Sequence, residues 1–221
     1  MAKKNISGYT LGEEIFSSVT HGVGALLGIA ALVLMIVFTA IGKGTALDIV
    51  GVCIYGATLI ILYTISTLYH SLTNPKAKKV FKVLDHCSIY LLIAGTFTPM
   101  CFSCLISTGY KMIILVSLIW LAAIIGIVLY ACFPHRFKIL NIALYVLMGW
   151  SILFMMGDLI AILKAAHSMS TLYFLLAGGI AYTVGVIFYA FKKVPYFHPV
   201  FHLFVLGGSV CHFFAVLLYI L

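Results

Sequence analysis

The segment MIILVSLIWLAAIIGIVLYACF, residues 112–133, decides the fold of this chain. It carries no charged side chain, and it is longer than the roughly 20 apolar residues that a helix needs to cross a membrane. Only helices and closed barrels satisfy all their backbone hydrogen bonds inside a bilayer. Because this segment is apolar throughout rather than at alternate positions, it predicts a transmembrane helix and not a barrel strand.

Six other apolar stretches, separated by polar breaks, repeat this pattern. The seven predicted spans are residues 21–41, 46–71, 86–106, 112–133, 139–163, 172–191 and 199–221. Of the 221 residues, 64% are hydrophobic and only 8% are charged, whereas about 25% are charged in a typical soluble domain. The composition therefore excludes a water-soluble fold and predicts a single all-α domain, residues 1–221, in the cell membrane.

The basic residues predict the orientation of this domain. Ten of them fall on one side of the predicted spans, namely Lys3, Lys4, Lys76, Lys78, Lys79, Lys82, Arg136, Lys138, Lys192 and Lys193, and three fall on the other, namely Lys43, Lys111 and Lys164. Because loops rich in Lys and Arg stay in the cytoplasm, we expect a cytoplasmic N-terminus and a C-terminus outside. We expect no nucleic-acid partner, since the charges are scattered over short loops.

With this topology, polar residues from four predicted helices fall at one depth near the cytoplasmic surface. They are Glu14, Ser17 and His21 from the first helix, Ser66 and His70 from the second, Asp85 from the third, and His198 and His202 from the seventh. Ionisable residues at membrane depth are costly, so they tend to face the interior of a helix bundle and mark a functional site. We therefore expect these side chains to lie together.

His198 and His202 have the spacing with which two imidazoles on one helix can bind one metal ion. Taken alone, this spacing more often marks two hydrogen-bonded histidines at a helix end. His70 and Asp85, predicted at the same depth, favour a metal site. Three neutral imidazoles with an open fourth position are the ligands of a catalytic zinc ion.

Asp85 and Ser66 are the predicted catalytic residues of such a site. Asp85 is a candidate to hold or deprotonate a zinc-bound water, and Ser66 to contact that water or a substrate oxygen. The alternative for Asp85 is an ion pair with Lys82 at a helix N-terminus, and the alternative for Ser66 is a hydrogen bond to its own helix.

Glu14 and the remaining histidines are expected to have other roles. Glu14 and His21 are candidates to contact the metal ligands rather than the metal, although His21 fits a packed polar residue equally well. His212 is about 15 Å deeper than His202 along the same helix, so we expect a hydrogen-bonded core histidine there. His86 points about 100° away from Asp85 around the helix, and His135 and His167 lie in predicted loops.

Four segments of the chain resemble the bacterial hemolysin III proteins, a branch of the progestin and adiponectin receptor superfamily. These segments are EEIFSSVTH at 13–21, STLYH at 66–70, LDH at 84–86 and HPVFH at 198–202. The resemblance implies a seven-helix fold with a zinc ion near the cytoplasmic face. It implies His70, His198 and His202 as metal ligands, Asp85 as the residue that holds the zinc-bound water, and Ser66 beside it.

Proline at position 199 affects the expected geometry of the first α-helical turn in the last segment. Pro199 disfavours helical geometry at the preceding residue, so we expect His198 to reach the metal from a helix-cap position.

The same resemblance implies kinship with alkaline ceramidases, which hydrolyse a lipid amide. The first hypothesis for function is therefore a zinc-dependent hydrolase that acts on an amide or ester of membrane lipids. The second is a non-enzymatic membrane sensor or regulator whose zinc holds helices together. The third is a pore-forming cytolysin, which ranks lowest because the sequence has neither a secretion signal nor an amphipathic insertion segment.

Overall fold

The structure is a computed structural model that describes residues 8–134, 136–191 and 194–220. Within these ranges the regular structure is entirely helical, which confirms the all-α prediction. The elements are α1 (Leu11–Ile41), α2 (Ala46–Ser71), α3 (Pro75–Pro99), η1 (Met100–Cys104), η2 (Leu105–Thr108), α4 (Tyr110–Cys132), α5 (Lys138–Gly149), η3 (Ser151–Met155), α6 (Met156–Ala165), α7 (Met169–Ala190) and α8 (Phe197–Ile220).

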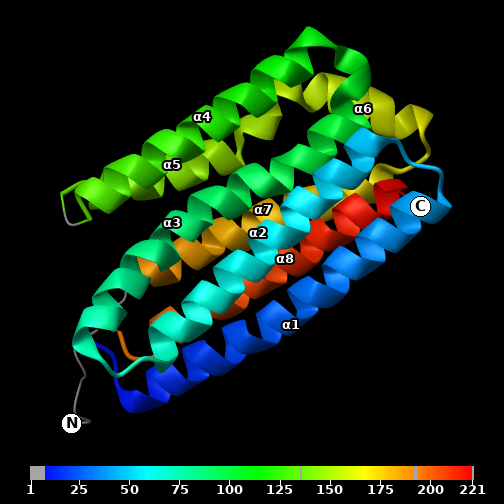
Figure 1. Cartoon of the computed structure of the whole chain (residues 1–221). Coiled ribbons are helices and arrows are strands. Elements are labelled where there is room, and N and C mark those ends of the chain that lie inside the picture. Colours follow the sequence, from blue (N-terminus) through cyan, green and yellow to red (C-terminus); the bar gives the residue numbers. More distant parts are fainter. Residues whose placement is uncertain (1–7, 135, 192–193, 221) are drawn as a thin grey trace.

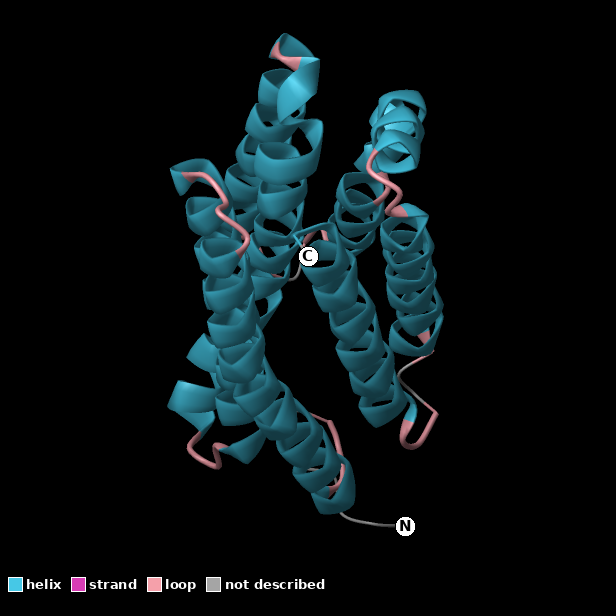
Figure 2. Ribbon diagram, turned by 90° about the vertical axis from the view of Figure 1, so that its right-hand side faces the viewer, coloured by secondary structure: helices cyan, strands magenta, loops and turns pink. Residues whose placement is uncertain are grey.

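Among the described residues, seven helical segments are long and apolar enough to cross a membrane, as the sequence predicts. Five of them are single helices: α1, α2, α4, α7 and α8. The third segment is α3 continued by the π-helix η1 and the 3₁₀-helix η2, and the fifth is α5 and α6 joined through the 3₁₀-helix η3. The segments run side by side, and short loops connect them (Figures 1 and 2).

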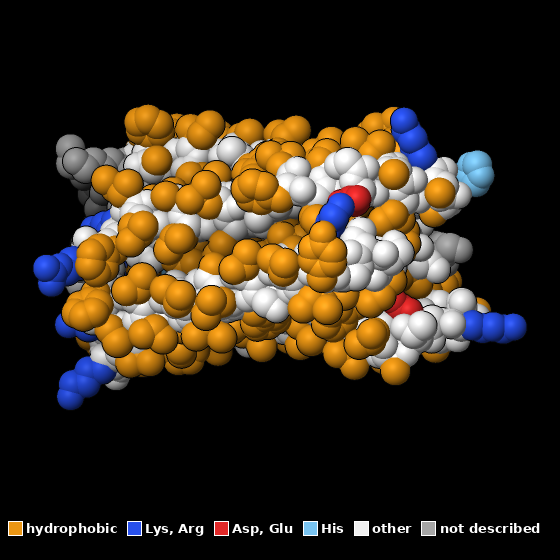
Figure 3. All heavy atoms as spheres, turned by 90° about the horizontal axis from the view of Figure 1, so that it is seen from above, with side chains coloured by type: hydrophobic (Ala, Val, Ile, Leu, Met, Phe, Trp, Pro, Cys, Tyr) orange, Lys and Arg blue, Asp and Glu red, His pale blue; other side chains and the backbone are white. Residues whose placement is uncertain are grey.

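The flanks of the molecule are apolar. Figure 3 shows hydrophobic side chains over most of one flank, with Lys and Arg side chains projecting mainly at its two ends. Large apolar residues of α1 and α4 such as Leu26, Val33, Leu118 and Ile124 are more than half exposed. A surface of this kind is stable only against lipid, so the chain is a multi-pass membrane protein.

Helices α1 and α3 begin earlier than predicted, at Leu11 instead of residue 21 and at Pro75 instead of residue 86. In α1, Thr10 and Glu13 form a capping box, in which each side chain bonds the backbone N–H of the other residue. In α3, the Asn74 side chain accepts bonds from two backbone N–H groups and Pro75 occupies the first helical position. These caps extend both helices, so Glu14 and Asp85 lie inside helices.

The packing places α2 and α3 at the centre of the bundle. Helix α1 packs on α2 and α8, α3 packs on α2 and α4, and α7 packs on α8. A Cβ at Gly24 of α1 would lie 2.6 Å from the Tyr63 ring of α2, so glycine is required for this close approach. As a result, the polar face of α1 is buried against the ends of α2 and α8.

Candidate metal centre

Three histidines from two helices converge at one end of the bundle. His70 belongs to the last turn of α2, and His198 and His202 belong to the first two turns of α8. The Nε2 atom of His198 lies 3.3 Å from Nε2 of His70 and 3.1 Å from Nε2 of His202. All three residues are at least 95% buried, and their ligand atoms lie within 4.8 Å of one another. This cluster could hold a metal ion.

Two of the three separations between the ligand nitrogens fit a tetrahedral ion. Zn–N bonds of about 2.0–2.1 Å at tetrahedral angles separate ligand nitrogens by about 3.3–3.4 Å. The two Nε2 separations given above, 3.3 and 3.1 Å, are close to this value. The separations of His198 from His70 and from His202 are therefore compatible with a shared tetrahedral ion.

The prediction from Pro199, that His198 reaches the metal from a helix-cap position, is wrong, because His198 lies inside α8. Helix α8 begins at Phe197, so His198 and Pro199 are its second and third residues. Proline is tolerated there because the first N–H groups of a helix have no partner within the helix. Both histidines of α8 therefore share one regular helix face, four residues apart.

Glu14 determines which nitrogen of His70 faces the cluster. Its Oε2 atom lies 2.6 Å from Nδ1 of His70, and both side chains are buried. A carboxylate only accepts hydrogen bonds, so Nδ1 carries the proton and donates it. In neutral His70 the lone pair is then on Nε2, the atom that faces His198, as metal binding requires.

His21 contacts the cluster without joining it. Its ring stacks on His202 with 3.7 Å between centroids, and the edge of Tyr63 packs on it at 5.0 Å. These contacts hold the ring plane of His202. The prediction that His21 contacts a metal ligand agrees with this geometry, and so does the alternative of a packed polar residue.

Ser66 and Asp85 lie on the wall of a cavity that His21 and His202 also line. Ser66 is 1% exposed and its Oγ has no hydrogen-bond partner among the described residues, so the alternative of a bond to its own helix is wrong. The Asp85 carboxylate lies 3.8 Å from Nδ1 of His86, and no ion pair joins it to Lys82, which is also described. The alternative proposed for Asp85 is therefore also wrong.

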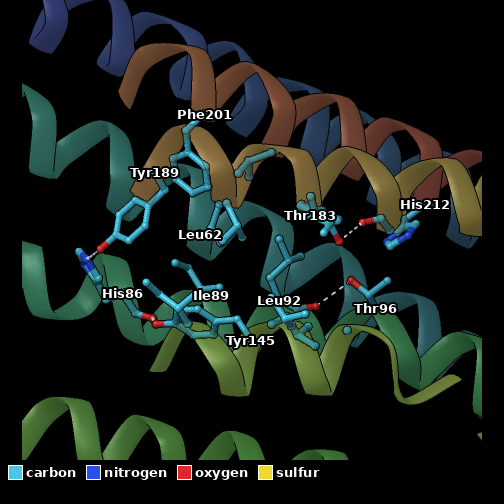
Figure 4. Close-up of a pocket in the computed structure, with 18 of the residues that line it drawn as sticks. Leu62, His86, Ile89, Leu92, Thr96, Tyr145, Thr183, Tyr189, Phe201 and His212 are labelled. Atoms are coloured by element: carbon cyan, nitrogen blue, oxygen red, sulfur yellow. Dashed lines mark hydrogen bonds between the residues drawn. The ribbon is translucent and has the colours of Figure 1, made fainter. Parts of the chain in front are cut away.

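The cavity has a volume of about 140 Å³ and walls that are almost entirely apolar. Leu62, Ile89, Leu92 and Phe201 contribute to these walls, as Figure 4 shows. Tyr189, at one end, has its ring 6.4 Å from that of His198, and His212 lies at the opposite end. The cavity thus extends from the histidine cluster into the depth of the bundle.

Sequence reasoning missed two aromatic contributions to this region. His86 lines the cavity, where its Nδ1 donates to the Lys82 carbonyl and its Nε2 accepts from the Tyr189 hydroxyl at 3.2 Å. Tyr9 stacks on the His198 ring at 4.5 Å, and burial raises the pKa of its hydroxyl. Positions around a single helix could not predict the His86–Tyr189 or the Tyr9–His198 contact, because the two partners of each contact lie far apart in the sequence.

The other histidines lie away from the cluster. His212 contacts the Leu175 carbonyl of α7 through Nε2 at 3.2 Å, which agrees with a hydrogen-bonded core residue. His167 is exposed, in the turn between α6 and α7. His135 lies outside the described residues.

Comparison with known proteins places this arrangement in context. A family profile described as Haemolysin-III related matches residues 9–213. The chain is 44% identical over 212 residues to the Hemolysin-3 homolog of Bacillus subtilis (strain 168), covering 96% of both chains. It is 44% identical over 209 residues to Hemolysin-3 of Bacillus cereus, covering 95% of this chain and 92% of the relative. Monocyte to macrophage differentiation factor of Homo sapiens is 26% identical over 173 residues, with 76% of this chain and 69% of the relative covered.

Proposed function

The chain belongs to the haemolysin-III-related family, and from this premise and the geometry of the histidine cluster we propose that it is a zinc-dependent hydrolase of membrane lipids. One observation carries the proposal: a buried cluster of three histidine nitrogens adjoins a long apolar cavity, with a carboxylate and an unpartnered hydroxyl on its wall. Each part of this arrangement has a task in the hydrolysis of an amide or ester.

The imidazoles of His70, His198 and His202 would hold the ion. Imidazole ligands suit several transition metals, and three of them with room for a fourth ligand favour zinc. A zinc ion bound there would polarise a substrate carbonyl and make water a better nucleophile near neutral pH. Glu14 supports this by holding His70 in the tautomer that offers Nε2.

Asp85 and Ser66 would handle the substrate and its protons. The carboxylate of Asp85 would accept a proton from the attacking water and return it to the leaving nitrogen or oxygen, so that the products are a carboxylic acid and an amine or alcohol. The Ser66 hydroxyl, which lacks a partner in the protein, would donate to the carbonyl oxygen of the substrate.

The cavity supports a lipid as substrate. Its apolar walls would take up a hydrocarbon chain, and the polar end would receive the amide or ester that links this chain to a headgroup. Lys76 and Lys79, at the start of α3, lie at the same end of the bundle as the histidines, and the basic-residue count therefore supports a site near the cytoplasmic face.

The experiment is an assay of purified protein in lipid nanodiscs that contain ceramide or phospholipid, with released fatty acid measured by mass spectrometry. We expect release by the wild type and none by His202→Ala. Asp85→Asn should keep its metal and lose roughly 10²–10⁴-fold in rate. The exposed residue His167 gives the control His167→Ala, which should match the wild type. Equal release by wild type and a folded His202→Ala would exclude the hydrolase.

A second function, a membrane sensor or regulator with a structural metal, is favoured by the origin of the ligands. His70 comes from α2 and the other two histidines from α8, so a metal would tie together two helices that are far apart in sequence. In that case chelation would loosen the fold while no lipid substrate is turned over. The same nanodisc assay separates the two functions.

A further inference from the structure

Lys78 differs from its basic neighbours at the start of α3. It is 5% exposed, whereas Lys76, Lys79 and Lys82 are exposed or half-buried. Its ammonium lies 2.9 Å from Oε1 of Glu14, and the two side chains are 6% and 4% exposed. Burying an ion pair costs more desolvation energy than an apolar pair of the same size would, so stability alone explains such a pair poorly.

The ion pair is joined directly to the histidine cluster through the two oxygens of one carboxylate. Oε1 of Glu14 contacts Lys78, and Oε2 contacts Nδ1 of His70 at 2.6 Å. Lys78 can only donate hydrogen bonds, so whatever group occupies position 14 must turn an acceptor toward it. The charge of Lys78 thereby controls how the side chain at position 14 is oriented.

We propose that Lys78 is a positioning residue of the metal centre, which acts through Glu14 to hold His70 in the tautomer that offers Nε2 to the ion. The inference rests on metal binding in the proposed function and does not depend on hydrolysis. Lys78 does not line the cavity, and it contacts His70 only at the backbone carbonyl, so its effect on the His70 imidazole must pass through Glu14.

A merely structural role for Lys78 is the competing explanation. Its Nζ also lies 3.2 Å from the Leu72 carbonyl and 3.5 Å from the His70 carbonyl, and it sits over the Tyr69 ring at 5.3 Å. These contacts would fasten the end of α2 to α3 whatever residue stood at position 14. The two explanations therefore differ in what they predict when Glu14 is changed.

Glu14→Gln separates them because an amide has one acceptor and one donor end. With Lys78 present, the amide oxygen turns toward the ammonium and the NH₂ group faces Nδ1 of His70. Nδ1 must then accept, the proton moves to Nε2, and the nitrogen that faces the cluster can no longer bind a metal. When Lys78→Met is added, the amide is free to turn its oxygen toward His70 and restore the original tautomer.

The test measures zinc affinity by competition with a chelating dye on full-length protein in detergent, with thermal unfolding as the check on folding. We expect Glu14→Gln to weaken zinc binding by roughly 10–100-fold, the usual effect of losing such a partner. Glu14→Gln/Lys78→Met should recover about 10-fold of this loss. The control Glu14→Gln/Lys79→Met changes an exposed lysine one residue away and should recover nothing.

A folded Glu14→Gln/Lys78→Met chain that binds zinc no better than Glu14→Gln would overturn the inference and leave the hydrolase proposal intact. Zinc binding with the expected recovery, but without lipid hydrolysis, would remove the hydrolase and leave this inference standing. A wild-type chain that binds no zinc would overturn both. Because the variants compared all carry a neutral residue at position 14, none of them leaves a buried carboxylate without its lysine.

Discussion

Ser66 and Ser209 are both buried serines, but only one of them has hydrogen-bond partners. Ser209 Oγ lies 2.7 Å from the hydroxyls of both Tyr63 and Tyr182, whereas Ser66 Oγ has no partner among the described residues and lines the cavity. A buried hydroxyl without a partner costs about 1–3 kcal/mol. Such a hydroxyl either destabilises the fold or serves to bind a ligand.

Ser66→Ala should therefore leave the free energy of unfolding unchanged or raise it, while it lowers lipid turnover. Ser209→Ala should lower the unfolding free energy by about 1–3 kcal/mol, because it removes a hydrogen-bond partner from the buried Tyr63 hydroxyl and from the part-buried Tyr182 hydroxyl. Thermal unfolding in detergent and the nanodisc assay together check this. If Ser66→Ala destabilises the protein as much as Ser209→Ala does, Ser66 has a structural role instead.

Helices α2 and α3 approach each other closely at Gly51, where the backbone of one helix meets the backbone of the other. A Cβ at Gly51 of α2 would lie 2.9 Å from the Cα of Pro99, the residue at which α3 gives way to the π-helix η1. Backbone cannot move aside as the tip of a side chain can. In contrast, a Cβ at Gly207 of α8 would meet nothing within 4 Å.

Gly51→Ala should accordingly cost about 1–3 kcal/mol of stability, as overpacking of a core does. Gly207→Ala should be neutral or stabilising by up to about 1 kcal/mol, since alanine is the better helix former. The comparison of unfolding midpoints for the two variants tests the α2–α3 contact. Equal midpoints would show that the two helices lie farther apart than the structure has them.

At the scale of the whole molecule, the cluster connects the second helical span to the last one. The ligands come from α2 and α8, and α1 packs against both of these helices. Any ion that binds the folded state and not the unfolded one stabilises the fold, by about 2.7 kcal/mol at a free concentration 100 times its Kd. A metal ion held by this cluster would therefore stabilise the fold.

Removal of the metal should lower the unfolding temperature of the wild type. A chelator such as EDTA should shift the wild type and His167→Ala equally, and should leave His202→Ala, which has already lost a ligand, unshifted. Differential scanning fluorimetry with and without added zinc measures this. A chelator shift of full size in His202→Ala would place the metal elsewhere in the molecule.

The orientation of the bundle remains a prediction of the basic-residue count. His167→Cys should react with a membrane-impermeant maleimide in intact cells, and Lys79→Cys should react only after the cells are opened. Both changes are made in a Cys132→Ser chain, because Cys132 is the exposed native cysteine among the described residues. The reverse labelling pattern would put the histidine cluster at the outer face.

Hydropathy alone predicted the class of fold and the seven spans, because the bilayer requires long apolar helices and leaves few alternatives. The candidate ligands His70, His198 and His202 also followed from sequence, since four-residue spacing and depth in the membrane depend only on helix geometry and topology. Hydropathy did not predict where α1 and α3 begin, because capping residues extend both helices through polar sequence.

The tertiary structure decided which polar groups meet between helices. The sequence marks Lys78 only as a basic residue of a cytoplasmic loop, yet its side chain is buried in an ion pair with Glu14. The sequence predicts that His86 points away from Asp85, yet His86 lines the same cavity. Sequence spacing reports positions around one helix, whereas these contacts depend on how that helix is rotated and packed against others. The apolar sequence by itself thus determines the membrane spans and identifies the candidate histidine ligands. Only the packing of α1, α2, α3 and α8 determines which side chains hold those histidines in place.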